Sequence, residues 1–344
     1  MECKTKKLAL LGFGNAGQAF AKLLMEKHDE IIEKYGFDVM VTAIATNSKG
    51  NLVCADGIDL AKALSDLEES GKFQDENCLV DKNTLEIVSE ADYDVLVEMT
   101  PLNIFTGQPA ISHIETAFSR RKDVITANKG PVAWKFSQLS KIARDNNLKF
   151  YYETTVMDGT PVFNLVDKTL MMAKVTEVSG ILNSTTNFIL EELAKGAEYD
   201  DIMSRGRSMG FIEADPAMDI EGYDAAAKIT ALLNVLMEAD ITPDMVDRKG
   251  IEDITVEDIK AADKRGNVIK LLCKGVRDEK GNVKASVKPE EVPKNHMLAS
   301  IDSTTSVVSI TTDLMKTVSI IEHEPEIEQT AYGVFGDLLR VLSE

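Results

Sequence analysis

The stretch GFGNAG, Gly12 to Gly17, decides the fold that we expect for the first part of this 344-residue chain. Its spacing is G-x-G-x-x-G, and it lies between the strand-like run KLALLGF and a long helical pattern. Gly12 would allow a tight turn, Gly14 would let the backbone approach a pyrophosphate, and Gly17 would let helix and strand pack closely. The stretch therefore predicts a turn that binds a dinucleotide.

The helix that begins after this turn supplies the other half of the predicted site. The N–H groups of its first turn, at Asn15 and Ala16, have no partner inside the helix, and the helix dipole is positive at that end. A pyrophosphate would bind there. A hexapeptide of this spacing can also be an ordinary strand–helix turn, but its place directly after a strand favours dinucleotide binding.

The chain up to about residue 150 alternates strand-like runs with helical patterns. The expected strands are KLALLGF, VMVTAIAT, YDVLVEMT, DVITAN and LKFYYETT. Between several of them lie segments such as AGQAFAKLLMEKHDEIIEKYG, with apolar residues at helical spacing. Such alternation is typical of an α/β fold, here a Rossmann-type, doubly wound parallel sheet with helices on both faces.

The rest of the chain has a different pattern, which we interpret as an α+β domain with its own sheet. The expected helices are near 161–172, 185–195, 199–208, 223–239 and 326–343, and the expected strands near 174–182, 283–287 and 305–321. The segment KPEEVPKNH, 288–296, is expected to be a surface loop because of its prolines and charges. The predicted division is a dinucleotide-binding domain over 1–150, a substrate domain over 151–325 and a C-terminal helix over 326–344.

Composition limits the partners of the chain. A net charge of -19 opposes binding to nucleic acid or to an anionic membrane surface. No window approaches the ~18 uninterrupted apolar residues of a membrane helix, and the first apolar run breaks at Gly12, too early for a secretion signal. The four cysteines, Cys3, Cys54, Cys78 and Cys273, fit reduced thiols better than disulfides or zinc. We expect a cytoplasmic protein whose partner is a small molecule.

The residues after the second strand bear on the choice of cofactor. An acidic side chain there would bond the ribose 2′-hydroxyl of NAD, but the strand VMVTAIAT runs into Asn47, Ser48 and Lys49. A hydroxyl and a cation suit a 2′-phosphate, so the sequence favours NADP. The same residues could form an ordinary polar turn, and NAD therefore stays open.

Two further strands end in polar residues. EMTP, Glu98 to Pro101, and ITANKGPVA, Ile125 to Ala133, each close a strand at the carboxyl edge of the sheet, where ligands bind in such folds. Thr100 and Lys129 would then face the cofactor. Taken alone, Lys129 is better explained as a solvated loop lysine.

The segment EADPAMDIEGYDAAAK, 213–228, holds five carboxylates followed by one lysine. Pro216 and Gly222 favour an irregular loop over 213–222, from which the carboxylates could converge. The core face of the helix that follows would consist of Ala225, Ile229, Leu232, Leu233 and Leu236. Lys228 lies beside that face and should be at least half buried, with Asp224 one turn earlier on its side. A surface ion pair or an acidic patch is the simpler alternative.

Five motifs, in this order, resemble those of the homoserine dehydrogenase family, and the resemblance covers nearly the whole chain. They are GFGNAG, TANKGPVA, ETTVMDGTP (153–161), GILNSTTNFIL (180–190) and GFIEADPAMDIEGYDAAAK (210–228). The last two are highly specific. The resemblance implies a dinucleotide-binding domain, a substrate domain whose sheet forms a homodimer, and a last helix that packs on the first domain. No ACT-type regulatory module follows, so we expect the short form.

The resemblance also implies an activity and the residues that carry it. The reaction is the reversible oxidation of L-homoserine to L-aspartate 4-semialdehyde with NAD(P), a step towards threonine, methionine and isoleucine. Lys228 corresponds to the lysine that moves the proton, Lys129 to a second lysine of the site, and Asp224 to a carboxylate that orients Lys228. The substrate contacts would come from Glu213, Asp219, Asn183, Ser184 and Thr185, with Glu213 holding the ammonium. Burial and a second cation would favour loss of the lysine's proton.

Family members often bind Na⁺ or K⁺ through backbone carbonyls, here those of Glu153, Val156, Asp158 and Thr160. Two departures from the family pattern bear on this site and on the cofactor. VMDGTP carries Met157 and Asp158 where many members have small residues, and IEHEPEIEQTAYG stands where many have a glycine-rich loop. Two alternatives therefore stay open, a dehydrogenase of the same build for another amino or hydroxy acid, and a non-catalytic regulator that binds dinucleotides.

Overall fold

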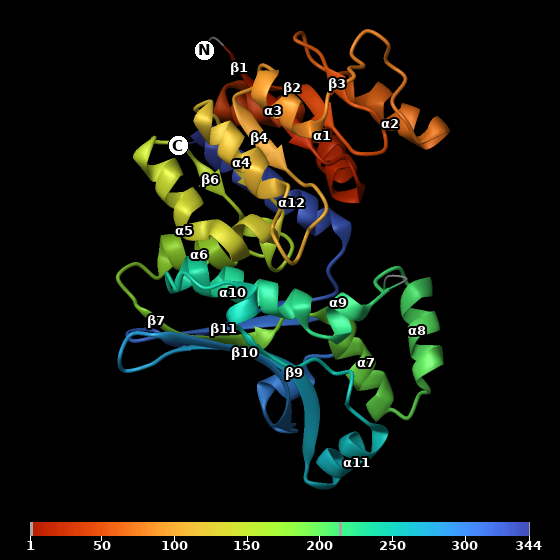
Figure 1. Cartoon of the computed structure of the whole chain (residues 1–344), viewed down its shortest axis with the longest axis vertical. Helices are drawn as coiled ribbons and strands as arrows, with labels where there is room; N and C mark the ends of the chain where they lie inside the picture. The colour runs from red at the N-terminus through yellow and green to blue at the C-terminus, as the bar shows by residue number, and fades with distance from the viewer. Residues whose placement is uncertain (1–2, 213–214, 344) are drawn as a thin grey trace. The chain divides into compact units, whose positions relative to one another are not determined.

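The computed structural model describes residues 3–212 and 215–343. It divides into two compact units, one built from the chain up to Pro161 together with the chain from Glu326 onward, the other from Val162 to Pro325. Each unit is built around a six-stranded sheet of its own (Figure 1).

The first unit is a sheet with helices on both faces, as the alternation of strands and helices predicts. Its strand order is β3-β2-β1-β4-β5-β6, and every pairing is parallel except that of β3 with β2. The strands are β1 (Lys4–Leu11), β2 (Phe37–Ala45), β3 (Leu52–Val53), β4 (Val95–Glu98), β5 (Asp123–Thr126) and β6 (Phe150–Tyr151). The helices are α1 (Asn15–Tyr35), α2 (Leu60–Ser70), α3 (Thr84–Glu90), α4 (Ala110–Ser119), α5 (Lys129–Asp145), the short η1 (Glu153–Thr155) and α12 (Ile327–Ser343).

Successive residues of β1 face opposite cores. Leu8 and Leu10 belong to the core that α1 and α12 cover, whereas Ala9 and Leu11 belong to the core that α3, α4 and α5 cover. A parallel strand that is buried on both faces is an uninterrupted apolar run in sequence, as KLALL is. The doubly wound fold class is therefore confirmed.

The last helix is part of the first unit. α12 lies against α1 and η1, and its apolar side chains complete the core on that face (Figure 1). Two glycines bring it close to the turn after η1: a Cβ at Gly333 would lie 2.2 Å from Thr154 Oγ1, and one at Gly159 would lie 2.3 Å from the carbonyl oxygen of Gln329. Any larger side chain at either position would separate the helix from the turn.

The second unit is an α+β fold with the strand order β12-β11-β7-β9-β10-β8, antiparallel except for β10 with β8. The strands are β7 (Val175–Ile181), β8 (Asp247–Arg248), β9 (Asn267–Arg277), β10 (Val283–Pro293), β11 (Ser306–Thr312) and β12 (Lys316–Glu322). The helices are α6 (Val162–Thr169), α7 (Ser184–Ala194), α8 (Tyr199–Ser208), α9 (Ala217–Ile220), α10 (Tyr223–Leu236), α11 (Val256–Lys264) and the short η2 (Pro243–Met245) and η3 (Met297–Ser300). α10 crosses one face of the sheet, against β7, β9 and β10 (Figure 1).

Several predictions for this unit are wrong in detail. The expected loop 288–296 begins with strand, because β10 continues to Pro293. After Val287 its pairing with β8 ends, and among the described residues β9 alone pairs with it, so positions at the open edge tolerate proline. The run 305–321 is a hairpin of two strands rather than one strand, and α9 forms a helical turn inside the expected loop 213–222.

The expected core face of α10 is buried except at Leu236, which is partly exposed. None of the helices described combines the length and the hydropathy that crossing a lipid bilayer requires.

Candidate active site

The glycine turn has the geometry that its spacing predicts. Gly12 has φ +87°, and a Cβ there would lie 2.3 Å from the carbonyl oxygen of Met99. A Cβ on Gly17 would lie 2.7 Å from the carbonyl oxygen of Gly12, whereas no described atom lies within 4 Å of a Cβ on Gly14. β1 therefore turns tightly into α1, and the start of the helix at Asn15 is exposed.

The residues after β2 lie beside this turn. Asn47 and Ser48 are exposed, and the ammonium of Lys49 donates to the carbonyl oxygen of Phe13 at 2.7 Å. Lys49 is thereby held next to the glycine turn. No carboxylate occurs in the sequence between β2 and β3, over residues 46–51.

Asn128 links the ends of β4 and β5. Its Nδ2 donates to the carbonyl oxygen of Thr100 at 3.0 Å, and its Oδ1 accepts from the N–H of Gly130 at 2.9 Å as the N-cap of α5. These two hydrogen bonds fix Asn128 beside Thr100. Lys129, the first residue of α5, follows Asn128 directly, so its backbone is held there too. The residues that the first unit brings to the carboxyl edge of its sheet are Gly12, Gly14, Asn15, Ala16, Gly17, Lys49, Thr100 and Lys129.

In the second unit, Asn183 is the centre of a polar cluster. As the N-cap of α7, its Oδ1 accepts from the backbone N–H and from the hydroxyl of Thr186, both at 2.9 Å. Its Nδ2 donates to Asp219 Oδ1 at 2.7 Å and to Asp224 Oδ2 at 3.0 Å. The end of β7 thus directs one buried amide at two carboxylates.

Lys228 lies beside the same carboxylates. Its Nζ lies 3.2 Å from Asp224 Oδ2 and donates to the carbonyl oxygen of Leu182 at 2.8 Å, and its side chain is only 20% exposed. α10 starts after Gly222, whose φ of +79° lets the chain turn from α9 into α10. The structure therefore places a largely buried ammonium between a carbonyl and a carboxylate; the helical spacing predicts the burial and the contact with Asp224, but not the carbonyl of Leu182.

Burial raises the pKa of the Asp219 carboxyl, and the neighbouring Asp224 carboxylate raises it further. The hydrogen bond from Asn183, the charge of Lys228 and the hydroxyl of Thr185 oppose this rise. Asp219 and Asp224 thus place two carboxyl groups side by side, with Lys228 and the amide of Asn183 against them.

Of the remaining predicted substrate residues, Thr185 is buried near Phe211, whose carbonyl oxygen lies 3.5 Å from its hydroxyl. Glu213 lies outside the described residues. No sequence pattern points to the carbonyl of Leu182, because every residue carries such a group. Cys273 on β9 is also near this cluster; burial raises the pKa of its thiol to about 12, which makes it unreactive.

The four residues that the family resemblance connects with a cation lie in η1, at Glu153, and in the turn after it, at Val156, Asp158 and Thr160. Thr154 Oγ1 lies 2.6 Å from the carbonyl oxygen of Asp158 and 3.1 Å from that of Thr330 on α12. The hydroxyl of Thr330 donates to Asp158 Oδ1 at 2.5 Å, and Asp158 has φ +39°. Asp158, one of the two departures from the family pattern, is thus tied to the last helix.

A buried carboxyl lies behind this turn. Asp337 on α12 is 1% exposed, and its Oδ2 accepts from the N–H of Glu153 at 2.9 Å. Its Oδ1 has no hydrogen-bond partner among the described residues, although the guanidinium of Arg340 lies 3.6 Å away. Burial raises the pKa of Asp337 to about 7.

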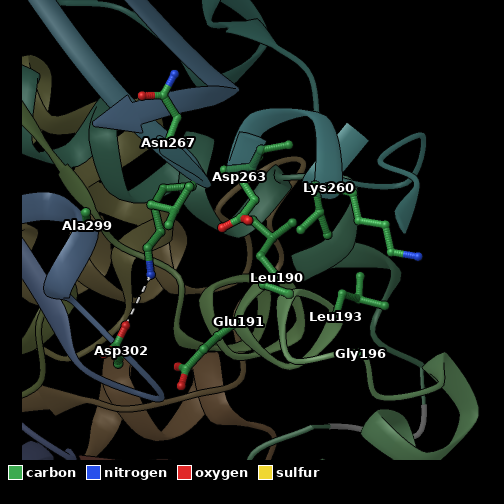
Figure 2. Close-up of a pocket in the computed structure, with 14 residues that line it drawn as sticks. Leu190, Glu191, Leu193, Gly196, Lys260, Asp263, Asn267, Ala299 and Asp302 are labelled. Atoms are coloured by element: carbon green, nitrogen blue, oxygen red, sulfur yellow. Dashed lines mark ion pairs between the residues drawn. The ribbon is translucent and has the colours of Figure 1, made fainter. Parts of the chain in front are cut away.

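The second unit also has a pocket of about 180 Å³ between α7, α11 and β9 (Figure 2). This pocket is separate from the polar cluster around Asn183. The buried Lys270 reaches its wall, and burial lowers the pKa of that ammonium. Its Nζ donates to Asn187 Oδ1 at 2.9 Å and to the carbonyl oxygen of Ile301 at 2.6 Å, and it lies 3.7 Å from Asp302 Oδ1. Because these oxygens satisfy the ammonium, we assign Lys270 a structural role that joins β9 to α7 and to the chain after η3.

The doubly wound sheet with its glycine turn defines a dinucleotide-binding fold, and comparison with known families shows the class of NAD-binding oxidoreductase to which the chain belongs. Residues 12–153 match the family model described as homoserine dehydrogenase, NAD binding domain, and residues 161–339 match the model described as homoserine dehydrogenase. The chain belongs to the homoserine dehydrogenase family.

Individual relatives are similar over their whole length. The NAD(+)-dependent homoserine dehydrogenase of Pseudomonas canavaninivorans is 33% identical over 336 residues, which are 97% of this chain and 96% of that protein. The homoserine dehydrogenase of Methanocaldococcus jannaschii is 35% identical over 336 residues, 97% of this chain and 98% of that protein. The crystal structure of a putative homoserine dehydrogenase from Archaeoglobus fulgidus has a TM-score of 0.87 at 32% identity, covering 98% of this chain and all of that chain.

Proposed function

We propose that Lys228 is the general acid/base of this homoserine dehydrogenase. In the oxidation, the hydroxyl proton of L-homoserine would pass to the neutral amine of Lys228. A hydride would leave the carbon that bears this hydroxyl for C4 of the nicotinamide. The nicotinamide, when bound, would supply the hydride acceptor, so that the alcohol would become the aldehyde of L-aspartate 4-semialdehyde. The observation that supports this role is the position of Lys228, largely buried and held between Leu182 and Asp224.

The substrate is a zwitterion, so a closed site needs groups for its ammonium. We propose Asp219, Asp224 and Glu213 for the ammonium and the reacting hydroxyl, with Asn183 and Thr185 as neutral partners. The cluster supports this proposal because Asp219 and Asp224 lie close enough to share one amide donor, and the charge of Asp224 raises the pKa of Asp219. Two adjacent carboxylates attract a cation, and a substrate ammonium would form charge-assisted hydrogen bonds with them.

The experiment that tests this proposal compares Lys228→Ala with Lys260→Ala, a change at an exposed lysine of α11. We expect Lys228→Ala to lower kcat for homoserine by at least ~10²-fold, the usual scale for an acid/base group, with unchanged cofactor affinity. Lys260→Ala should behave as wild type. Equal kcat values for the two variants would contradict the proposal, and initial rates with homoserine analogues would show whether another hydroxy acid is preferred.

For the cofactor we propose contacts from Gly12, Gly14, Asn15, Ala16 and Gly17 to the pyrophosphate, and from Thr100 and Lys129 near the nicotinamide. We further propose that NADP is preferred, with Asn47, Ser48 and Lys49 at its 2′-phosphate. The absence of a carboxylate over residues 46–51 and the fixed place of Lys49 beside the glycine turn support this preference.

A monovalent cation, Na⁺ or K⁺, is proposed for the carbonyls of Glu153, Val156, Asp158 and Thr160. Hard cations take oxygen ligands, and buried oxygen atoms are concentrated here, among them Oδ1 of Asp337, which has no hydrogen-bond partner among the residues that the structure describes. A cation would add positive charge beside this turn and help to fix its backbone. We also propose a homodimer formed through the second sheet, a cytoplasmic location, and a role in threonine and methionine biosynthesis, all of which the family resemblance supports.

A further inference from the structure

A carboxylate that no proposed step uses is buried at the end of β4. Glu98 is 0% exposed. Its Oε1 accepts from the backbone N–H of Thr100 at 3.2 Å and also from the Thr100 hydroxyl. Its Oε2 accepts from the hydroxyl of Thr126, at the end of β5, at 3.3 Å. One carboxylate thus holds the ends of two neighbouring strands.

The contact with Thr126 continues towards α5. The hydroxyl oxygen of Thr126 accepts from the N–H of Asn128 at 3.0 Å, and Asn128 in turn donates to the carbonyl oxygen of Thr100. Asn128 is the N-cap of α5 and directly precedes Lys129. The hydrogen bonds that start at Glu98 therefore extend to the residue before Lys129. The backbone of both loops that carry the proposed nicotinamide contacts therefore depends on Glu98.

A histidine lies on the other side of the carboxylate. His113 on α4 is 1% exposed, and its Nδ1 lies 3.6 Å from Glu98 Oε1. Its Nε2 lies 2.9 Å from the hydroxyl of Thr84 on α3, which fixes the ring. The imidazole Nδ1 has no hydrogen-bond partner among the described residues, so the hydroxyls of Thr100 and Thr126 and the N–H of Thr100 are the groups that donate to the carboxylate.

Burying a carboxylate is unfavourable unless hydrogen bonds compensate it, and an apolar side chain would fill the same space with less risk to stability. The donors that satisfy Glu98 are Thr100, just after β4, and Thr126, the last residue of β5. The chain after β4 also passes close to the glycine turn, because a Cβ on Gly12 would meet Met99 and the backbone nitrogen of Thr100. From this placement we propose that Glu98 is a positioning residue that fixes Thr100 and Lys129 for the nicotinamide half of the cofactor.

This inference rests on the proposed function of Thr100 and Lys129. The test measures the dissociation constant of NADPH and NADH for the full chain by calorimetry, together with KM for homoserine at saturating cofactor. Glu98→Gln keeps the size but replaces one acceptor oxygen by a donor, so Thr100 or Thr126 loses its partner. We expect at least a ~10-fold weaker cofactor affinity, the scale of a lost charged hydrogen bond, and a KM for homoserine within about twofold of wild type.

The control is Thr42→Val, which removes buried hydrogen bonds of Thr42 to the carbonyl oxygens of Leu8 and Asp92 in the same sheet. It should lower the melting temperature and leave cofactor affinity unchanged, as a merely structural change does. If Glu98→Gln shows that same pattern, positioning by Glu98 is overturned. Should Glu98→Gln not fold, Thr126→Val replaces it, with the expectation of a severalfold weaker affinity; unchanged affinity in that variant also overturns the proposal.

The variants Thr100→Val and Lys129→Ala separate this inference from the function on which it rests. Unchanged cofactor affinity in both would overturn the proposed cofactor role of these residues. Weakened affinity in both, combined with unchanged affinity in Glu98→Gln, would overturn only the positioning by Glu98.

Discussion

Lys228 and Asp224 are one turn apart on α10, and the lysine Nζ lies 3.2 Å from the carboxylate Oδ2 with both side chains largely buried. An exposed pair at this spacing contributes little to stability. Here the same ammonium also donates to Leu182, and the same carboxylate accepts from Asn183. The pair is therefore part of a fixed network at the end of β7, in which each member has a defined direction.

The first prediction concerns the charge of Asp224. Asp224→Asn keeps the size of the side chain but removes the anion that orients Lys228. We expect kcat for homoserine to fall by roughly 10-fold or more, the scale of a lost charged hydrogen bond, with cofactor affinity unchanged. The control is Asp253→Asn, which removes an exposed pair with Lys249 at 3.4 Å. A wild-type kcat in Asp224→Asn would show that the pair has no part in proton transfer.

The second prediction concerns the pH dependence of stability. Because the pKa of Asp219 is raised in the folded chain, the folded state binds its proton more tightly than the unfolded state does. Asp219 therefore favours folding below the ordinary aspartate value of ~3.9, and this contribution is lost as the pH rises through the raised value. The stability of Asp219→Asn relative to wild type should therefore be greater at about pH 8 than at about pH 4. The variant should also lose activity. Urea unfolding at the two pH values measures this difference in stability, and an equal offset at both would contradict it.

The third prediction concerns the contact between α12 and the turn after η1. Gly333→Ala would place a Cβ 2.2 Å from Thr154 Oγ1, and we expect a loss of roughly 1–3 kcal/mol in the free energy of unfolding. Gly336→Ala, on the same helix, has no described atom within 4 Å of the added Cβ. It should be neutral or stabilising by up to ~1 kcal/mol, because alanine favours a helix over glycine. Similar stabilities for the two variants would show that the close approach does not matter.

The fourth prediction concerns the choice between the two nicotinamide cofactors. Lys49→Met keeps the length of the side chain and removes the charge beside Phe13. If Lys49 binds the 2′-phosphate, the KM for NADP should rise by roughly 10-fold and the KM for NAD should change little. Initial rates with each cofactor measure the ratio. An equal change in both values would indicate that Lys49 only supports the turn.

The sequence predicted those parts of the molecule in which local pattern and environment agree. Uninterrupted apolar runs identify strands that are buried on both faces. The glycines of residues 12–17 identify the tight turn from β1 into α1. In the same way, the spacing of α10 predicts the burial of Lys228 and its contact with Asp224. These features depend on residues that are close together along the chain.

Features that depend on distant residues could not be predicted. Glu98 is one residue of an apolar strand in sequence, and only the fold brings His113 and Thr126 to it. The prolines of β10 suggest a loop, yet the open edge of the sheet tolerates them. In each case the deciding neighbour belongs to another element.

The place of α12 in the first unit has a consequence for the synthesis of the chain. A ribosome completes residues up to Pro161 and then the whole of the second unit before α12 emerges. Until then the nascent first unit lacks the apolar side chains that α12 supplies to its core. The second unit can therefore finish folding earlier than the first. Until α12 has emerged, the first unit exposes an apolar face that a chaperone could bind.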